Sequence, residues 1–375
     1  MRKSIYLFAA MIFTLSAKAQ QADYKLLIGT YTTPGKSEGI YVYNFNTSTA
    51  DLTPVSIQRN VVNPSFLALT PDQKFLYAVN EDGERSTVSA FSFDAATGKL
   101  AYLNKQKAEG TDPCYVIADD KNVMIANYSS GSIAVFGRDR SGALTPAKQV
   151  IQHTGSSMDT ARQASAHVHM VRFTPEGKYI VSNDLGEDKV YFYTYHQDAE
   201  DSVLVPKQGL ADGINIKAGS GPRHIIFSKN GKFAYLVQEM KADLTAFSYA
   251  DGMLKPIQAT SLVDKNFSGE SGGSDIQLSP DGRFLYVSNR GTANTITTFS
   301  VGKDGKLTRK AQIGTGGKGP RAFVIDPSGN WLLVGHQNSN DIIIFKRNKI
   351  TGELKDTGKK LDIGAPVCFV FVRQK

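Results

Sequence analysis

The fold is decided by the stretch PSFLALTPDQKFLYAVNE, residues 64–81, because the same design returns as PRHIIFSKNGKFAYLVQE at residues 222–239. Each stretch begins with an apolar strand, continues through a tight polar turn, and ends in a second strand rich in aromatic residues. Short strands bounded by turn residues are the pattern of antiparallel β-hairpins. The chain therefore repeats one hairpin design.

This repeat runs along most of the chain. Further copies of the hairpin occupy residues 168–185, 273–290 and 320–337, and a degenerate copy begins at Pro113. A third strand is predicted after each copy, at Val88–Phe93, Ser132–Phe136, Lys189–Tyr193, Leu244–Tyr249, Thr295–Val301 and Asp341–Phe345. A Gly-x-Leu turn then often leads to a fourth strand, at residues 98–100, 142–144, 252–254, 305–307 and 352–354. Four strands at a period of about 50 residues predict the blades of a β-propeller.

The two ends of the chain complete the count of blades. Residues 364–372 form an inner strand with no outer strands behind it, whereas Tyr24–Thr30, Gly39–Phe45 and Leu52–Gln58 are outer strands with no inner strand before them. Pairing the ends removes the exposed sheet edges of an open ring. The sequence thus predicts an all-β, seven-bladed β-propeller with four antiparallel strands per blade, a closing blade shared by both termini, and a single domain over residues 20–375.

The first residues have the design of an export signal. Arg2 and Lys3 precede the apolar stretch Ile5–Leu15, and Ala17-Lys18-Ala19 supplies small residues at an A-x-A cleavage site. We expect residues 1–19 to be a signal peptide cut after Ala19, and the mature protein to be periplasmic or secreted. Because no later apolar segment reaches spanning length, we expect no membrane span in the mature chain.

Charge and cysteine content narrow the partners. The net charge is +8 for the whole chain and +5 without residues 1–19, and the basic residues are scattered, which argues against a nucleic-acid partner. Cys114 and Cys368 fall on inner strands of blades that are not neighbours, so we expect two free thiols and no disulfide. We also expect the protein to be a monomer.

Aligning the hairpin copies reveals a polar position at the start of each inner strand. That position holds Ser65, Cys114, His169, Arg223, Ser274, Arg321 and Val367. The following alternate positions are mostly apolar, as packing between blades requires. Because blades are related by rotation, His169, Arg223 and Arg321 should meet at the mouth of the central channel.

A second polar position ends the second strand of the copies. It holds Glu81, Tyr128, Leu185, Glu239, Arg290 and Gln337, and the residues before them include Asn289. Glu239 and Arg290 fall on adjacent blades, close enough to share a ligand. The two positions together predict a funnel for an anionic, oxygen-rich small molecule. His167 and His169 could contact a metal, but no third ligand is fixed, so we expect neither a metal nor an organic cofactor.

Several of these segments occur together in one known family. GPRH at 221–224, SNRG at 288–291, AHVH at 166–169 and GPR at 319–321, together with Glu239, resemble the seven-bladed lactonase family. That family includes a bacterial 6-phosphogluconolactonase and a fungal carboxymuconate lactonizing enzyme. The resemblance runs from about Tyr24 to the C-terminus.

The resemblance implies a catalytic site built on His169, Arg223, Glu239 and Arg290. The expected substrate-binding residues are Arg321, Asp275, Gln337, Asn289 and His224. The family commonly has Glu where this chain has Asp275, and His where it has Ala322. These departures leave the four catalytic candidates intact and bear on substrate specificity.

The function expected from these residues is hydrolysis of a sugar-type lactone. Glu239 or His169 would activate water, and the arginines would stabilise the oxyanion that forms. The residues leave open which of the two takes the proton. Two alternatives remain at this stage: a non-catalytic propeller that binds a carbohydrate or a protein, and a cycloisomerase that forms a lactone from a muconate-type diacid.

Overall fold

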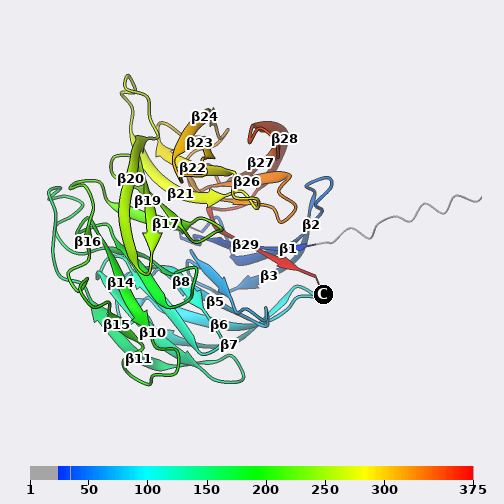
Figure 1. Ribbon diagram of the computed structural model, residues 1–375. Helices are drawn as coiled ribbons and strands as arrows, with labels where there is room; N and C mark the ends of the chain where they lie inside the picture. Colours follow the sequence, from blue (N-terminus) through cyan, green and yellow to red (C-terminus); the bar gives the residue numbers. More distant parts are fainter. Residues whose placement is uncertain (1–23, 34, 375) are drawn as a thin grey trace, which may run out of the picture.

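A computed structural model describes residues 24–33 and 35–374, which form a ring of seven antiparallel sheets around a central axis (Figure 1). Each innermost strand contacts the innermost strand of the next sheet, and the last one, β29, contacts β4, so the ring is closed. This confirms the predicted seven-bladed propeller. The predicted signal peptide lies outside the described residues. Within the described ranges, no helix is long and apolar enough to cross a membrane.

The strands follow the predicted order within each blade. The innermost strands are β4 (Leu67–Leu69), β8 (Pro113–Ala118), β12 (Val168–Phe173), β17 (Pro222–Phe227), β21 (Ser271–Leu278), β25 (Pro320–Ile325) and β29 (Pro366–Arg373). The second strands are β5 (Phe75–Asn80), β9 (Asn122–Asn127), β13 (Tyr179–Asp184), β18 (Phe233–Gln238), β22 (Phe284–Gly291), β26 (Trp331–His336) and β1 (Tyr24–Thr30).

The outer half of each blade is built from the third and fourth strands. The third strands are β6 (Thr87–Asp94), β10 (Ser132–Arg138), β14 (Lys189–Tyr195), β19 (Asp243–Ala250), β23 (Thr295–Val301), β27 (Asp341–Arg347) and β2 (Gly39–Phe45). The fourth strands are β7 (Lys99–Lys107), β11 (Leu144–Gln152), β15 (Leu204–Pro206), β20 (Met253–Ser261), β24 (Leu307–Gly314), β28 (Leu354–Asp362) and β3 (Leu52–Arg59). One 3-10 turn, η1 (Gly83–Arg85), precedes β6.

The closing blade joins the two ends of the chain. Its strand order is β29-β1-β2-β3, and β29 pairs with β1 from Tyr24 opposite Arg373 to Thr30 opposite Pro366. Figure 1 shows the red β29 beside the blue β1. The structure therefore confirms the closing blade that the unpaired ends of the sequence predicted.

The blade that begins with β12 departs from the four-strand plan. Its outer edge is split into β15 and the two-residue β16 (Ile214–Asn215), both of which pair with β14. The Gly-x-Leu turn found in most blades is missing from this stretch of sequence. Without that turn, the chain returns to β14 twice instead of forming one long edge strand.

A β-bulge lies at the start of most inner strands. The pairing register skips one residue in each of β8, β12, β17, β25 and β29, and the skipped residues are Cys114, His169, Arg223, Arg321 and Val367. A bulge bends the strand and redirects a side chain that takes no place in the ladder. These residues occupy the first polar position found in the sequence. The bulge therefore explains why that position is not apolar.

The Gly-x-Leu turn has a packing reason as well as a conformational one. Gly352 has a φ of 79°, in the region that L side chains rarely adopt, and a Cβ there would overlap the ring of Phe284 in the preceding blade. The Gly352 carbonyl also accepts a hydrogen bond of 2.7 Å from Tyr286 Oη. Gly142 and Gly305 meet phenylalanine rings in the same way. Each turn thus locks one blade to its neighbour.

Replacing Gly352 with alanine should lower the free energy of unfolding by about 2–4 kcal/mol, because backbone strain and overpacking act together. Gly177→Ala is the matched control, since Gly177 has a φ of 69° and a Cβ added to it would meet no atom within 4 Å. It should cost only about 1 kcal/mol. Urea unfolding of both variants measures the difference, and equal losses would show that the Phe284 contact contributes nothing.

Candidate active site

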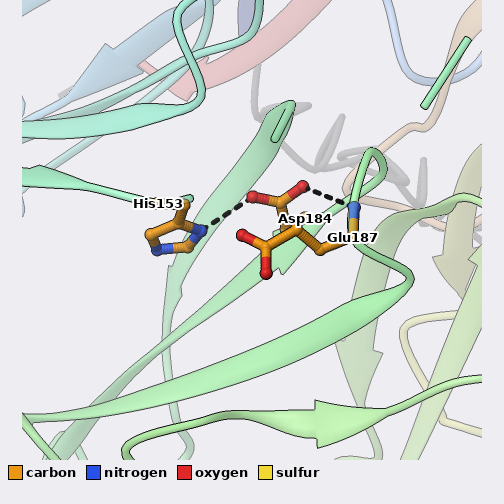
Figure 2. A group of neighbouring side chains, drawn as sticks. All are labelled: His153, Asp184 and Glu187. Carbon is orange, nitrogen blue, oxygen red and sulfur yellow. Dashed lines mark hydrogen bonds and ion pairs between the residues drawn. The ribbon is translucent and has the colours of Figure 1, made fainter. Parts of the chain in front are cut away.

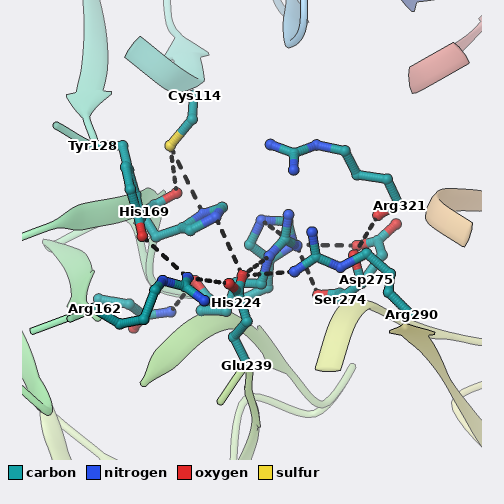
Figure 3. A network of polar contacts seen from close by, with 12 residues as sticks. Cys114, Tyr128, Arg162, His169, His224, Glu239, Ser274, Asp275, Arg290 and Arg321 are labelled. Carbon is teal, nitrogen blue, oxygen red and sulfur yellow. Dashed lines mark hydrogen bonds and ion pairs between the residues drawn. The ribbon is translucent and has the colours of Figure 1, made fainter. Parts of the chain in front are cut away.

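One carboxylate lies at the centre of the polar funnel. Glu239 directly follows β18 and contacts three guanidinium groups: Arg162 Nη2 is 2.6 Å from its Oε1, while Arg290 Nη2 and Arg223 Nε are 2.8 and 3.1 Å from its Oε2. Figure 3 shows these side chains converging on Glu239. The structure thus brings the predicted Glu239, Arg223 and Arg290 together.

The arginines decide the ionisation of Glu239. Burial favours its neutral form, but the charges of Arg290 and Arg223 outweigh burial and hold the pKa of Glu239 well below its usual value. The carboxylate is therefore ionised at neutral pH. Since its two oxygens already accept hydrogen bonds from guanidinium groups, it is a weak Brønsted base.

Arg223 is the most deeply placed of these cations. The bulge in β17 directs it inward, where it donates a hydrogen bond of 2.7 Å from Nη1 to the Ser274 carbonyl on the next blade. Burial and the nearby charges of Arg290 and Arg321 lower the pKa of Arg223 to about 10. Arg223 is thus fixed between two blades and remains a cation at neutral pH.

His169 lies beside Glu239 and is neutral. Its Nε2 is 4.0 Å from Glu239 Oε2, and its Nδ1 is 3.7 Å from the Sγ of Cys114 in the neighbouring blade. Burial and the positive charge of Arg223 hold the pKa of His169 well below its usual value. An uncharged imidazole with one ring nitrogen facing the funnel can accept a proton from water.

Arg162 is a site residue that the sequence analysis missed. It lies in the long connection between β11 and β12, residues 153–167, and reaches Glu239 and the Tyr128 hydroxyl, the latter at 3.3 Å. Gln163 ties this loop to the body of the propeller through a 2.8 Å hydrogen bond to the Leu185 carbonyl. Because the loop is not part of the repeat, aligning the copies could not find Arg162. The only signal was the unusual length of the connection.

Two adjoining hollows form the mouth of the funnel. One, of about 750 Å³, is lined by Arg162, Glu239, Arg290, Arg321 and Gln337 among others, and the second, of about 400 Å³, shares the first four of these residues. Among the described residues, the Arg321 guanidinium has no hydrogen bond or ion pair and lies 5.4 Å from the centre of the Tyr31 ring. A cation without an anionic partner is well placed to bind an oxygen of a substrate.

Three predicted substrate-binding residues lie elsewhere. His224 and Asp275 line a channel of about 330 Å³ along the inner strands and pair with each other, with His224 Nδ1 3.2 Å from Asp275 Oδ1. Burial lowers the pKa of His224 and raises that of Asp275. Asn289 is fully buried, and its Oδ1 accepts the Gly272 N–H at 2.8 Å. These three side chains support the walls of the site, and none lines the two hollows.

The two cysteines stay apart, as predicted. Both are buried free thiols. Cys114 lies at the mouth of the channel, where its Sγ is 3.4 Å from the His169 carbonyl, and Cys368 lines the same channel from the closing blade. Burial raises the pKa of both thiols, so each is protonated at neutral pH. The Cys114 thiol can therefore donate a weak hydrogen bond and helps to position His169.

Comparison with known proteins agrees with this geometry. Residues 25–371 match the model of the family described as lactonase, 7-bladed beta-propeller. The chain belongs to this lactonase family. The departures from the family that we noted in the sequence, Asp275 and Ala322, both line the inner channel. The hollow around Glu239 is therefore unchanged by them.

Named relatives of this lactonase family cover nearly the whole chain. The 6-phosphogluconolactonase of Bacillus subtilis is 34% identical over 352 residues, which is 92% of this chain and 98% of that protein. A solved structure from Bacteroides fragilis is 43% identical and has a TM-score of 0.90, with 95% of this chain and 99% of that chain covered. The structure of a periplasmic gluconolactonase from Pseudomonas aeruginosa is 34% identical, with a TM-score of 0.89 and coverage of 94% and 100%.

Proposed function

We propose that this protein hydrolyses a sugar-type lactone to the corresponding sugar acid. The observation that carries the proposal is the ionised Glu239 held by three arginines beside a neutral His169, at the base of an open hollow. Ester hydrolysis needs a base for water and positive charge for the oxyanion, and this arrangement offers both. The names of the relatives support the same chemistry.

The reacting water is best placed between His169 and Glu239. Their facing atoms, Nε2 and Oε2, are 4.0 Å apart, so one water molecule can donate a hydrogen bond to each. As the water oxygen attacks the lactone carbonyl, its proton passes to His169, and the ring ester bond then breaks as the leaving oxygen takes up that proton. Arg290 and Arg321 would hold the carbonyl oxygen and the anionic part of the substrate.

His169 is the better of the two bases that the sequence left open. Glu239 Oε1 already accepts from Arg162 and Oε2 from Arg223 and Arg290, so its lone pairs are engaged. In this proposal Glu239 orients the water and balances the arginines, and His169 takes the proton.

The place of action is part of the proposal. Residues 1–19 have the design of a cleavable signal peptide, and one relative is a periplasmic gluconolactonase. We therefore infer that the mature chain acts in the periplasm or outside the cell, as a monomer. Sugar phosphates are cytosolic metabolites, so an uncharged gluconolactone is as good a substrate candidate as its 6-phosphate.

The first test is acid release from the purified mature chain, followed by pH-stat with glucono-1,5-lactone and its 6-phosphate side by side. Turnover above spontaneous hydrolysis is expected, and the ratio of the two kcat/KM values reports whether the phosphate matters. A lactone product formed from a muconate-type diacid would instead indicate a cycloisomerase. No turnover of any lactone would overturn the proposal.

The pH profile should lack the inflection of an ordinary histidine. Because the pKa of His169 is lowered well below 6.5 and that of Glu239 well below 4.5, both groups are unprotonated as pH falls through 6.5. We expect kcat/KM to stay constant between about pH 5 and 7, with activity lost only at lower pH. A half-maximal rate near pH 6.5 would show that neither group acts as described.

A further inference from the structure

A second polar cluster lies outside the funnel, on the blade that begins with β12. His153 directly follows β11, Asp184 ends β13, and Glu187 lies in the turn between β13 and β14. Figure 2 shows the three side chains pointing toward one another from two neighbouring blades. All three are buried, and one ligand atom from each lies within 4.8 Å of the other two. Their separation along the chain matches no metal motif, so no metal was expected here from the sequence.

One polar atom of each side chain is held from outside the cluster. Asp184 Oδ1 accepts backbone N–H groups of His167, Gly186 and Glu187 at 2.8–3.0 Å. The partners of the other two are tyrosine hydroxyls: Tyr193 Oη lies 2.7 Å from His153 Nε2, and Tyr191 Oη donates to Glu187 Oε2 at 2.8 Å. Outer contacts of this kind orient metal ligands in proteins.

The remaining atoms face the centre of the cluster. His153 Nδ1 is 2.8 Å from Asp184 Oδ2. Glu187 Oε1 is buried and has no hydrogen-bond partner among the described residues. Within the same part of the chain, the only cation near either carboxylate is Lys189, whose Nζ lies 3.4 Å from Glu187 Oε2. Two buried carboxylates facing one imidazole nitrogen thus leave negative charge and an unused acceptor atom in the interior.

We propose that His153, Asp184 and Glu187 bind a divalent transition metal ion of the zinc class. One imidazole nitrogen and two carboxylate oxygens suit Zn²⁺, whereas Ca²⁺ and Mg²⁺ prefer oxygen ligands alone. Binding requires the proton of His153 to lie on Nε2, from which it is donated to Tyr193 Oη, so that Nδ1 faces the ion. The imidazole stays neutral and exchanges one tautomer for the other.

The site would hold the loop that carries Arg162. The loop begins at His153, and Gly155 packs so closely that a Cβ would lie 2.7 Å from Glu187 Oε2. Further along, Ser157 Oγ donates to Asp188 Oδ2 at 2.6 Å. An ion bound to His153 and Glu187 would therefore join the loop to the blade and fix the position from which Arg162 reaches Glu239. Its role is structural, because none of its ligands lines the funnel.

The test compares metal binding by the full mature chain and two variants. Glu187→Gln keeps the shape of the side chain and removes its charge, and His196→Gln removes a histidine outside the cluster as the matched control. After chelation and dialysis, Zn²⁺ is titrated by calorimetry, and bound zinc is counted by elemental analysis. Circular dichroism of the metal-free proteins checks that each variant is folded.

We expect one Zn²⁺ per chain in the unaltered protein and in His196→Gln, with affinity reduced about 100-fold or more in Glu187→Gln. Zinc should raise Tm by several degrees in the first two proteins and hardly at all in Glu187→Gln. Stoichiometric binding that survives Glu187→Gln, or no binding by the unaltered protein, would overturn the proposal and leave a metal-free His–Asp pair. If Glu187→Gln does not fold, His153→Gln replaces it with the same expected outcomes.

Discussion

Replacing Glu239 with glutamine is expected to lower kcat for lactone hydrolysis by about 10²–10⁴-fold, or about 3–5 kcal/mol of transition-state stabilisation. Glutamine fills the same space but brings an amide N–H₂ toward at least one of the three guanidinium groups that contact Glu239. The water then loses an ionic acceptor, and the arginines lose the anion that orders them. Steady-state kinetics on the preferred lactone measures the loss.

The effect on KM distinguishes this role from a purely structural one. With one negative charge removed among the arginines, an anionic substrate should bind as well as before or more tightly, so kcat falls while KM holds or falls. Glu270→Gln is the control, because Glu270 lines the same hollow but is exposed and contacts none of the arginines by an ion pair. A loss of less than tenfold in Glu239→Gln would remove this residue from the catalytic machinery.

Ending the chain at Ile363 should abolish cooperative folding. This truncation removes β29, and with it the ladder to β1 and the buried side chains of Val367, Cys368 and Val372. Each buried valine contributes about 1.5–3 kcal/mol, and whole domains are stable by only about 5–15 kcal/mol. The neighbouring inner strands β4 and β25 would also lose the strand that they contact. We expect an aggregated product without a sharp thermal transition.

A shorter truncation provides the control. A chain ending at Arg373 retains all of β29 and loses only the contact of Gln374 with Asn44, a 3.0 Å hydrogen bond between side chains. Its Tm should stay within about 2 °C of the full chain, since surface contacts of this kind contribute little. A cooperative, soluble protein from the longer truncation would show that six blades suffice.

Most of the fold could be predicted because a propeller repeats its own instructions. Hairpin copies such as residues 64–81 and 222–239 carry the same turn and the same apolar alternation, so each strengthens the interpretation of the others. The outer edge of the third repeated blade was not foreseen. There the chain lacks the Gly-x-Leu turn, and the two short strands β15 and β16 depend on packing that leaves no periodic pattern.

The site was predictable only where it coincides with the repeat. His169, Arg223 and Glu239 occupy repeated positions, and the structure brings them together. Arg162 lies in a loop with no counterpart in the other blades, so its contact with Glu239 is a tertiary fact. Asn289 is the opposite case: it stands next to Arg290 in sequence, but neighbouring strand residues face opposite sides of a sheet, and Asn289 is buried in the wall.

The bulges at the start of the inner strands separate what the protein can change from what it must keep. A skipped residue such as Arg223 or Val367 takes no place in the ladder, so its side chain can be exchanged while the hydrogen bonds on either side continue. The ring thus offers a set of independently variable positions around one opening, mounted on a frame that does not depend on them. A scaffold of this kind can acquire a new substrate by single substitutions, without first having to rebuild its stability.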